Sequence, residues 1–297
     1  PVHGNGSRRA KLAGATMVCR PTIRIEILNK GEIGMITADK MTNAEYHAAD
    51  AISSSDVKMV HSKSLAHWKA KVYKSSPVFD IGTCVHAMVL EDGKGMVRGP
   101  DTRRGKAWTD LYEEAQAKGE TLLTAGDYDL AQNIAHSVVF HPAGRRMARD
   151  TTVNEASFFA TDPSTQLKIK CRPDSYWDAK GVIYDLKTCQ DASPKGVSKD
   201  MVSYNYAIQA AFYLHTMTCA GWPVDQFVFV NVEKSAPYAV STNILSPEYL
   251  AWGKHKMHET LHKIAKANEA QRWDTGWSDT TNVVVLPRWL QLDAAEF

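Results

Sequence analysis

The sequence lacks the long apolar runs that mark a membrane protein or a secretory leader. No stretch approaches the ~18 consecutive apolar residues of a membrane span, and residues 1–30 contain no apolar signal-peptide core. With 297 residues, of which 44% are apolar, the chain is long enough to bury a sizeable core. We therefore expect a soluble, cytoplasmic protein that has no contact with a membrane.

Cysteine is scarce and scattered. The five cysteines form no C-x-x-C pair and lie at Cys19, Cys84, Cys171, Cys189 and Cys219. This spacing disfavours a zinc ribbon, an iron–sulfur cluster and a disulfide framework. We predict reduced thiols and no iron–sulfur cluster.

A large excess of one charge sign is also missing, because the formal net charge is +2. Residues 1–30 hold six basic side chains against one acidic, whereas residues 31–297 hold 29 basic against 32 acidic. We interpret residues 1–34 as a basic N-terminal arm that is flexible or foreign to the native protein. In the remaining chain, any contact with nucleic acid must come from local basic patches.

No internal repeat or low-complexity linker divides the rest of the chain. Helical spacing of apolar residues predicts helices over 53–73, 79–91, 107–119, 125–141, 204–219 and 247–271. Alternating patterns and turn signals predict strands over 157–161, 166–172, 182–188, 226–233 and 238–245. The sequence therefore predicts an α/β protein with a central mixed sheet flanked by helices.

The segment CRPDSYWDAKGVIYDLKT (171–188) places charged side chains in an apolar hairpin. The strand period of two puts Asp185 and Lys187 on one face, and a turn at 178–181 brings Asp174 back towards Asp185. Two close carboxylates repel each other and raise the free energy of the fold unless a divalent cation neutralises them. With a lysine beside them, they suit metal-assisted hydrolysis of a phosphodiester. A surface ion pair and a turn aspartate would give the same pattern.

Further segments resemble one family of nucleases, the RecE-like (exodeoxyribonuclease VIII type) phage recombination exonucleases of the PD-(D/E)xK superfamily. The similar segments, in the family's order, are EYH…SSS within 41–70, GTCVH within 79–91, RPD with YDLKT, and IQAAFY at 208–213. The resemblance spans about residues 35–290. It implies a restriction-endonuclease-like core and a single exonuclease domain over 35–297.

The resemblance assigns roles by position. It implies a site for Mg²⁺, or alternatively Mn²⁺, formed by His86, Asp174, Asp185 and the Leu186 backbone carbonyl. Lys187 would lie beside the attacking water, and Gln209 and Tyr213, spaced i and i+4, would share one helix face lining the active site.

DNA contacts are expected outside the catalytic motif. The candidates are Ser53, Ser55, Arg103, Arg104, Lys106 and Arg172. The strand of Arg172 also carries Lys168 and Lys170, and a solvated sheet face is the alternative interpretation for it. The stretch GPDTRRGKAW (99–108) superficially resembles a P-loop, but five residues separate its glycines and Ala107 stands where a Ser or Thr must bind Mg²⁺. Hydrolysis should therefore be independent of ATP.

Together these features predict a Mg²⁺-dependent exonuclease that degrades double-stranded DNA from its ends. The resemblance implies 5′-to-3′ polarity, which leaves a 3′ single strand for an annealing partner, a ring-shaped homo-oligomer (tetramer or trimer), and a phage or prophage origin. Two alternatives stay open. One is a structure-specific or single-strand nuclease of the same fold, and the other is a catalytically inactive DNA-binding module.

Overall fold

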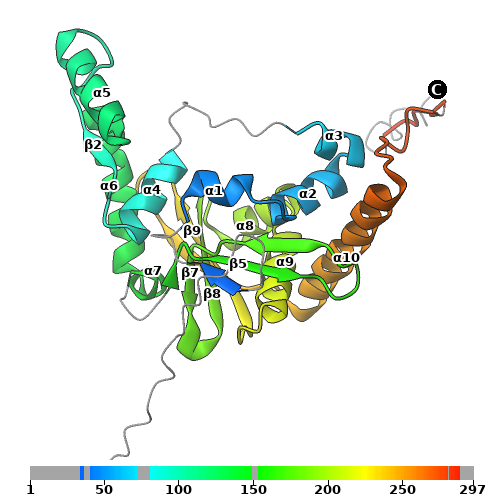
Figure 1. The fold of residues 1–297 in the computed structure, drawn as a ribbon. Helices are drawn as coiled ribbons and strands as arrows, with labels where there is room; N and C mark the ends of the chain where they lie inside the picture. The colour runs from blue at the N-terminus through cyan, green and yellow to red at the C-terminus, as the bar shows by residue number, and fades with distance from the viewer. Residues whose placement is uncertain (1–33, 37–40, 72–80, 149–152, 280, 288–297) are drawn as a thin grey trace, which may run out of the picture.

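The computed structural model describes residues 34–36, 41–71, 81–148, 153–279 and 281–287 (Figure 1). The predicted basic arm at 1–34 lies outside the described residues except for Gly34, which begins strand β1 (Gly34–Ile36).

A five-stranded mixed sheet lies at the centre, in the order β10-β9-β8-β7-β4. Its strands are β4 (Val153–Asn154), β7 (Ser175–Trp177), β8 (Val182–Cys189), β9 (Gln226–Glu233) and β10 (Val240–Asn243). Only β8 and β9 run parallel, and the other neighbours are antiparallel. This arrangement confirms the predicted fold class.

The described residues form two smaller sheets as well. One is antiparallel, in the order β1-β5-β6, and the other is a parallel pair. Their remaining strands are β5 (Ser157–Thr161), β6 (Lys168–Cys171), β2 (Met96–Arg98) and β3 (Thr121–Leu123).

The prediction of a hairpin over 171–188 is wrong in one respect. The strand predicted at 166–172 is β6, which pairs with β5, whereas the antiparallel partner of β8 is the short strand β7. Three residues carry too little periodicity to reveal a strand, so β7 was missed. Asp174 therefore lies where the chain leaves one sheet and enters the next, and the turn ending at Gly181 (φ +61°) leads into β8.

The helices follow the predicted spacing closely. Their bounds are α1 (Asn43–Ala48), α2 (Ser54–Ser62), α3 (Leu65–Lys69), α4 (Ile81–Leu90), α5 (Lys106–Lys118), α6 (Ala125–Phe140), α7 (Pro142–Met147), α8 (Pro194–Ser203), α9 (Tyr206–Cys219) and α10 (Pro247–Ala270). The helix predicted over 53–73 is the pair α2 and α3, while α1, α7 and α8 were not predicted. No helix among the described residues is long and apolar enough to cross a membrane.

Helix α9 is the middle layer of the molecule (Figure 1). On one side it packs against the five-stranded sheet, where Ala210 and Met217 share a core with Phe229. On its other side, Ile208 and Phe212 pack against β5, β6, α2 and α10. A helix that is apolar nearly all round belongs in the interior.

The opposite face of the five-stranded sheet is covered by α4 and α6. Tyr184 and Leu186 of β8 belong to this core, together with Val85 and Ile134 of the two helices. Because side chains alternate along a strand, Asp185 and Lys187 point to the α9 face. The packing of β8 therefore determines where its charged residues lie.

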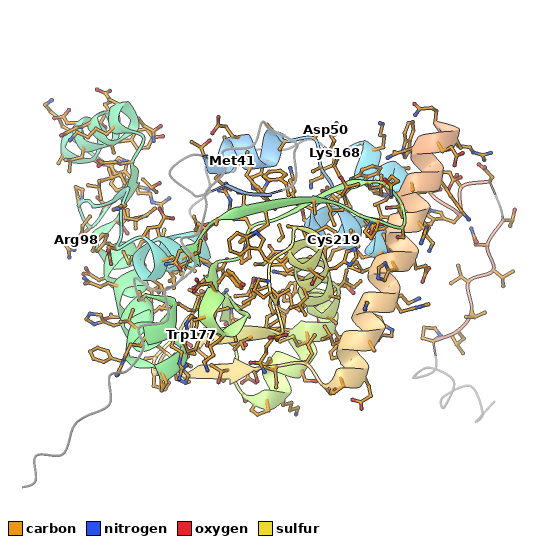
Figure 2. All side chains as sticks on the ribbon, turned by 60° about the horizontal axis from the view of Figure 1, so that its bottom comes forward. Met41, Asp50, Arg98, Lys168, Trp177 and Cys219 are labelled. Atoms are coloured by element: carbon orange, nitrogen blue, oxygen red, sulfur yellow. The ribbon has the colours of Figure 1, made fainter. Side chains whose placement is uncertain are left out.

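Figure 2 shows how the side chains fill these layers, with Arg98 on the part of the chain formed by β2, β3, α5 and α6, which extends beyond the central sheet (Figures 1 and 2). After α10 the chain packs back on α3, where Lys69 lies over the ring of Trp273, with 3.9 Å between Nζ and the ring centroid.

Candidate active site

Asp174 accepts hydrogen bonds from two separate elements. Its Oδ2 accepts from the backbone N–H of Leu186 at 2.6 Å and contacts His86 Nε2 at 2.9 Å. His86 Nδ1 lies 2.9 Å from the carbonyl of Gly82, which can only accept a hydrogen bond. Both ring nitrogens therefore carry a proton. Burial alone would lower the pKa of His86, but the charge of Asp174 raises it to about 9.

Asp185 lies deeper, with 2% of its side chain exposed. Lys187 Nζ contacts its Oδ2, and Gln209 Nε2 donates to its Oδ1 at 2.8 Å. Burial raises the pKa of Asp185, and the opposing attraction of Lys187 is partly offset by repulsion from Asp174. The predicted proximity of Asp185 and Lys187 is confirmed, and Gln209, predicted to line the site, contacts it directly.

Burial alone would also raise the pKa of Asp174. His86, Lys187 and the Leu186 N–H together lower it below its ordinary value. In the metal-free protein, an imidazolium and an ammonium thus neutralise the two carboxylates.

Sequence analysis missed Lys58, and it left Tyr206, near the helix face of Gln209 and Tyr213, out of the predicted site. Lys58 Nζ donates to Gln209 Oε1 at 3.3 Å, and it lies 5.6 Å from the ring centroid of Tyr206. Lys187 Nζ lies 5.3 Å from the same ring. Burial and then the nearby Lys187 lower the pKa of Lys58 to about 8. Both are single residues on helices, with no motif to mark them.

Glu155 is a third acidic residue that the sequence did not reveal. Its backbone is left-handed (φ +50°), and its N–H donates to the carbonyl of Asp174 at 3.2 Å. Burial and then repulsion from Asp174 raise the pKa of Glu155 to about 8. This carboxyl is thus largely protonated at neutral pH when no cation is bound.

A cavity of about 740 Å³ opens beside these groups. Its lining includes His86, Glu91, Glu155, Arg172, Leu186, Lys187 and Tyr206. Asp174 and Asp185 lie behind His86 and Lys187. The charged groups are therefore next to a space large enough for part of a substrate.

The donor set suits a hard divalent cation. Leu186 N–H points to Asp174, and the N–H and C=O of one strand residue point to the same edge, so the Leu186 carbonyl faces Asp174 as well. Carboxylates of Asp174, Asp185 and Glu155, one carbonyl and one imidazole are ligands that Mg²⁺ and Mn²⁺ accept. The protonated Glu155 indicates an excess of acidic groups, which a bound cation would relieve.

Tyr213 lies near this region, and neither catalytic carboxylate is among its hydrogen-bond partners in the described part of the chain. Its ring packs edge-on against Phe227, with centroids 5.8 Å apart. Burial raises the pKa of the Tyr213 hydroxyl well above its ordinary value, and Asp185 and Asp174 contribute to this rise. Its catalytic role stays a prediction.

Ser53 and Ser55 lie at the start of α2, apart from the catalytic cavity. The N–H and Oγ of Ser53 donate to Asp56 Oδ2 at 2.8 and 2.5 Å, which caps the helix. Ser53 lines a second cavity of about 460 Å³ with Asp56 and Lys71. Their contact with DNA stays a prediction.

The other basic candidates are dispersed. Arg103 pairs with Asp127 and Lys106 with Asp110 on the exposed surface. Lys106 begins α5, whereas Gly119, just after the other end of this 13-residue helix, lines the catalytic cavity, about 20 Å away along the helix. Together with Arg104, they lie about a helix length from the part of the cavity that Gly119 lines, and their contact with DNA stays a prediction.

Arg172 lines the cavity, although Ser157 and the carbonyl of Met41 accept hydrogen bonds from its guanidinium. The solvated face considered for the Arg172 strand is wrong at Lys170, which is 3% exposed. Its ammonium donates to the carbonyls of Tyr46 and Ala49, at the end of α1.

An aspartate just before β7, together with an aspartate and a lysine on β8 of a helix-flanked mixed sheet, is the arrangement that defines the PD-(D/E)xK superfamily of nucleases. A family model described as "PDDEXK-like domain of unknown function (DUF3799)" matches residues 53–282. The chain belongs to this family.

Comparison with solved structures supports the same fold. A crystal structure of a "Putative exonuclease" from Eubacterium rectale aligns with a TM-score of 0.55 at 14% identity, covering 87% of this chain and 98% of that one. A second structure, SSO0001, aligns with a TM-score of only 0.26 at 16% identity, covering 62% and 87% of the two chains. No curated protein matches the sequence. The RecE-like branch within the superfamily stays a prediction.

Proposed function

We propose that the protein is a Mg²⁺-dependent, ATP-independent exonuclease of double-stranded DNA, with Mn²⁺ as a substitute ion. The observation that carries this proposal is the convergence of Asp174, Asp185 and Lys187 beside a cavity of about 740 Å³. The nuclease fold and the oxygen-rich donor set support it.

Each residue of the site has a separate role in this proposal. Asp174, Asp185, the Leu186 carbonyl and His86 Nε2 would hold the cation. A bound divalent cation supplies charge that polarises the phosphate and acidifies a water molecule. To bind the cation, His86 would release its Nε2 proton to solvent, while its Nδ1–H would stay on the Gly82 carbonyl and fix the ring.

Lys187 and Gln209 act beside the cation. With a cation bound to Asp185, the Lys187 ammonium would be free to turn towards the cavity and orient the attacking water. Gln209 keeps the Asp185 carboxylate in position through Oδ1, and Lys58 holds the other end of the same amide.

The finer specificity rests on the resemblance to RecE-like enzymes. It supports 5′-to-3′ polarity, the release of 3′ single strands to an annealing protein, and a phage or prophage enzyme in the bacterial cytoplasm. In this proposal, Arg172 contacts DNA at the cavity, and the outer serine and basic candidates contact its backbone further away.

We further propose that the active species is a ring-shaped tetramer or trimer that encloses the duplex. A body with nearly balanced charge cannot retain DNA on one broad basic surface, but a ring concentrates local basic patches around a channel. Tryptophans near the C-terminal end are candidates for the interface between subunits. Among them, Trp277 is 47% exposed, Trp273 packs against Lys69 of the same chain, and Trp289 lies outside the described residues. Light scattering of the free and DNA-bound protein measures the subunit number.

Linear duplexes that carry a label at either the 5′ or the 3′ end test the proposed activity. In Mg²⁺ the 5′ label should appear at once as mononucleotide, whereas the 3′ label should stay on long strands. EDTA should stop the reaction, and ATP should leave its rate unchanged. The Asp185→Asn variant is the control for contaminating nucleases.

Three outcomes would contradict the proposal in different ways. Cleavage of covalently closed circular duplex, or of flaps and single strands alone, would identify a structure-specific nuclease. Immediate release of the 3′ label would reverse the polarity. DNA binding without any Mg²⁺-dependent cleavage would identify a catalytically inactive binding module.

A further inference from the structure

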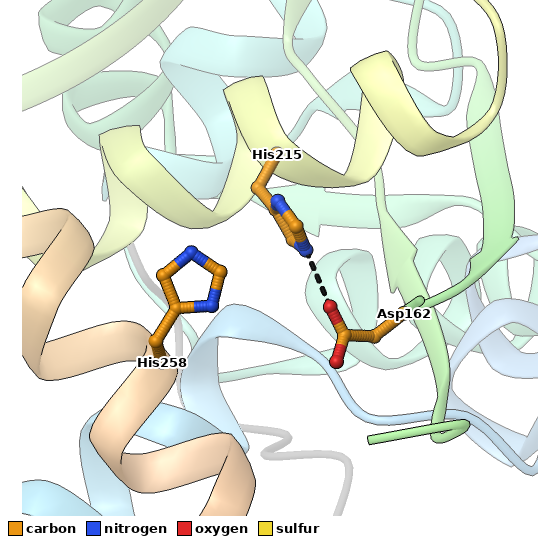
Figure 3. A group of neighbouring side chains, drawn as sticks. All are labelled: Asp162, His215 and His258. Carbon is orange, nitrogen blue, oxygen red and sulfur yellow. Dashed lines mark hydrogen bonds and ion pairs between the residues drawn. The ribbon is translucent and has the colours of Figure 1, made fainter. Parts of the chain in front are cut away.

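A second group of ionisable side chains lies at the other end of α9, apart from the active site (Figure 3). Asp162 follows β5 directly, His215 is on α9 and His258 is on α10. One nitrogen or oxygen atom from each of the three side chains lies within 4.8 Å of the other two. His215 and Gln209 are six residues apart, about 9 Å along the helix axis and on different sides of it.

The turn after β5 holds the Asp162 carboxylate in a fixed orientation. Oδ2 accepts hydrogen bonds from Ser164 Oγ at 2.7 Å, from Thr165 N–H at 2.9 Å and from Thr165 Oγ1 at 2.5 Å. Oδ1 points the other way, to His215 Nε2 at 2.7 Å. The turn thus saturates one oxygen and presents the other to the two histidines.

The imidazole rings of His215 and His258 both lie close to the Asp162 carboxylate. Their rings are edge to face, with centroids 5.0 Å apart and an interplanar angle of 78°. The Asp162 side chain is fully buried and that of His215 is 15% exposed. Burial and then the proximity of His215 lower the pKa of His258. Cys219, one turn beyond His215, places its Sγ 3.6 Å from His215 Nε2.

We propose that Asp162, His215 and His258 bind a transition-metal cation of the Zn²⁺ type, with water completing the coordination. Two imidazole nitrogens and one carboxylate oxygen suit Zn²⁺, whereas Mg²⁺ prefers oxygen ligands. Metal–ligand bonds of about 2.0–2.2 Å need ligand atoms about 3.4 Å apart, so a small rotation of His258 closes the site. On binding, the Nε2 proton of His215 would move to Nδ1 or to solvent, its hydrogen bond to Asp162 would be lost, and His215 Nε2 and Asp162 Oδ1 would both become ligands.

The proposed site would join three elements that share one core. The turn after β5, α9 and α10 meet around Ile208, Phe212 and Leu261. A cation bound there would tie α10 and the turn to the central helix. The same cation would have no access to the catalytic carboxylates, which lie on the side of α9 that faces β8.

Calorimetric titration of the metal-free full chain with Zn²⁺ tests this proposal. Excess Mg²⁺ is present throughout, to compete for the oxygen-rich catalytic site. The wild-type protein should bind one equivalent of Zn²⁺ at this site, and His258→Gln should weaken that binding by more than ~100-fold, since a lost ligand costs at least as much as a lost outer-shell partner. His255→Gln changes an exposed histidine on the same helix and should bind as the wild type does.

A second variant separates the two sites. Asp185→Asn should retain the Zn²⁺ equivalent, because Asp185 belongs to the catalytic group. The proposal is overturned if the wild-type chain takes up no stoichiometric Zn²⁺, if His258→Gln retains it, or if Asp185→Asn alone abolishes it. Because no DNA is present, these results are independent of whether the protein proves to be an exonuclease.

Discussion

The two groups of ionisable side chains on either side of α9 differ in donor type and in surroundings. The catalytic group is rich in carboxylates and adjoins a cavity of about 740 Å³. The Asp162 group has one carboxylate and two imidazoles, packed between a turn and two helices. Donor type determines which cation each group favours, and access to the cavity determines which one can act on a polymer.

The groups also differ in how their carboxylates are balanced. Asp174 and Asp185 repel each other and are neutralised by the positive charges of His86 and Lys187, a role that a bound cation would take over. Asp162 is satisfied by hydrogen bonds from its own turn, which lower its pKa to about 2 even though burial opposes this. The Asp174–Asp185 pair is therefore ready to bind a cation, whereas the Asp162 carboxylate is already stabilised without one.

The largest effect should come from removing a catalytic carboxylate. Asp185→Asn should lower the Mg²⁺-dependent cleavage rate by about 10³-fold or more, because the cation contributes several kcal/mol to stabilising the transition state. Thermal stability should change little, since the amide still pairs with Gln209. Rates of duplex digestion at saturating Mg²⁺ measure this effect.

Asp279→Asn is the matched control for Asp185, because that side chain is 78% exposed. It should digest DNA as fast as the wild-type protein. Near-normal cleavage by Asp185→Asn would refute the assignment of the site.

Lys187 should affect the chemical step more than binding. Lys187→Ala should lower the single-turnover rate by about 10²- to 10⁴-fold, the range expected for losing a general acid or base, while the affinity for DNA changes much less. Lys168→Ala, on an exposed strand position, is the control. If affinity falls and the single-turnover rate holds, Lys187 only anchors a phosphate.

Gln209 should have an intermediate effect, because it positions Asp185 without touching the substrate. Gln209→Leu removes the hydrogen bond to Asp185 Oδ1 and the one from Lys58. We expect Mg²⁺ affinity to fall about 10- to 100-fold, as for other outer-shell partners, with activity partly restored at high Mg²⁺. A Mg²⁺ titration of the cleavage rate checks this, and an unchanged midpoint would contradict it.

The smallest effect is expected from a substitution in the turn that orients Asp162. Thr165→Val removes one hydrogen bond to Oδ2 and keeps the shape of the side chain. The free energy of unfolding of the metal-free protein should fall by about 1 kcal/mol, with DNA cleavage unchanged. Denaturant unfolding measures the first quantity. Impaired cleavage would show that the two groups are coupled through α9.

Local periodicity predicted the parts of the site that lie on long elements. The alternation in VIYDLKT placed Asp185 and Lys187 together, and the spacing of Gln209 put it on the right helix. The sequence could not show that β6 and β7 belong to different sheets, because strand pairing depends on distant partners. A three-residue strand such as β7 also has no detectable period.

The residues that sequence analysis missed could not be found from the sequence for one shared physical reason. Lys58 and Glu155 come from segments far from the catalytic strands in the sequence, and each is a single charged residue among many. Only packing reveals that α2 brings Lys58 to Gln209 and that the left-handed backbone at Glu155 turns it towards Asp174. Asp162 likewise lies in a turn, and the two histidines that face it come from separate helices that only packing brings together.

The burial of α9 on all sides limits how the chain can change during evolution. At Gly253, α10 approaches so closely that an added Cβ would lie 2.3 Å from the carbonyl of Ala207. A larger side chain at Ala207, Ala210 or Ala211 has no solvent to turn into, so it must displace a sheet or α10. Any such displacement moves Gln209 relative to Asp185. Substitutions on this helix should therefore be accepted only together with compensating changes in its neighbours, which would make α9 the slowest-changing helix in the family.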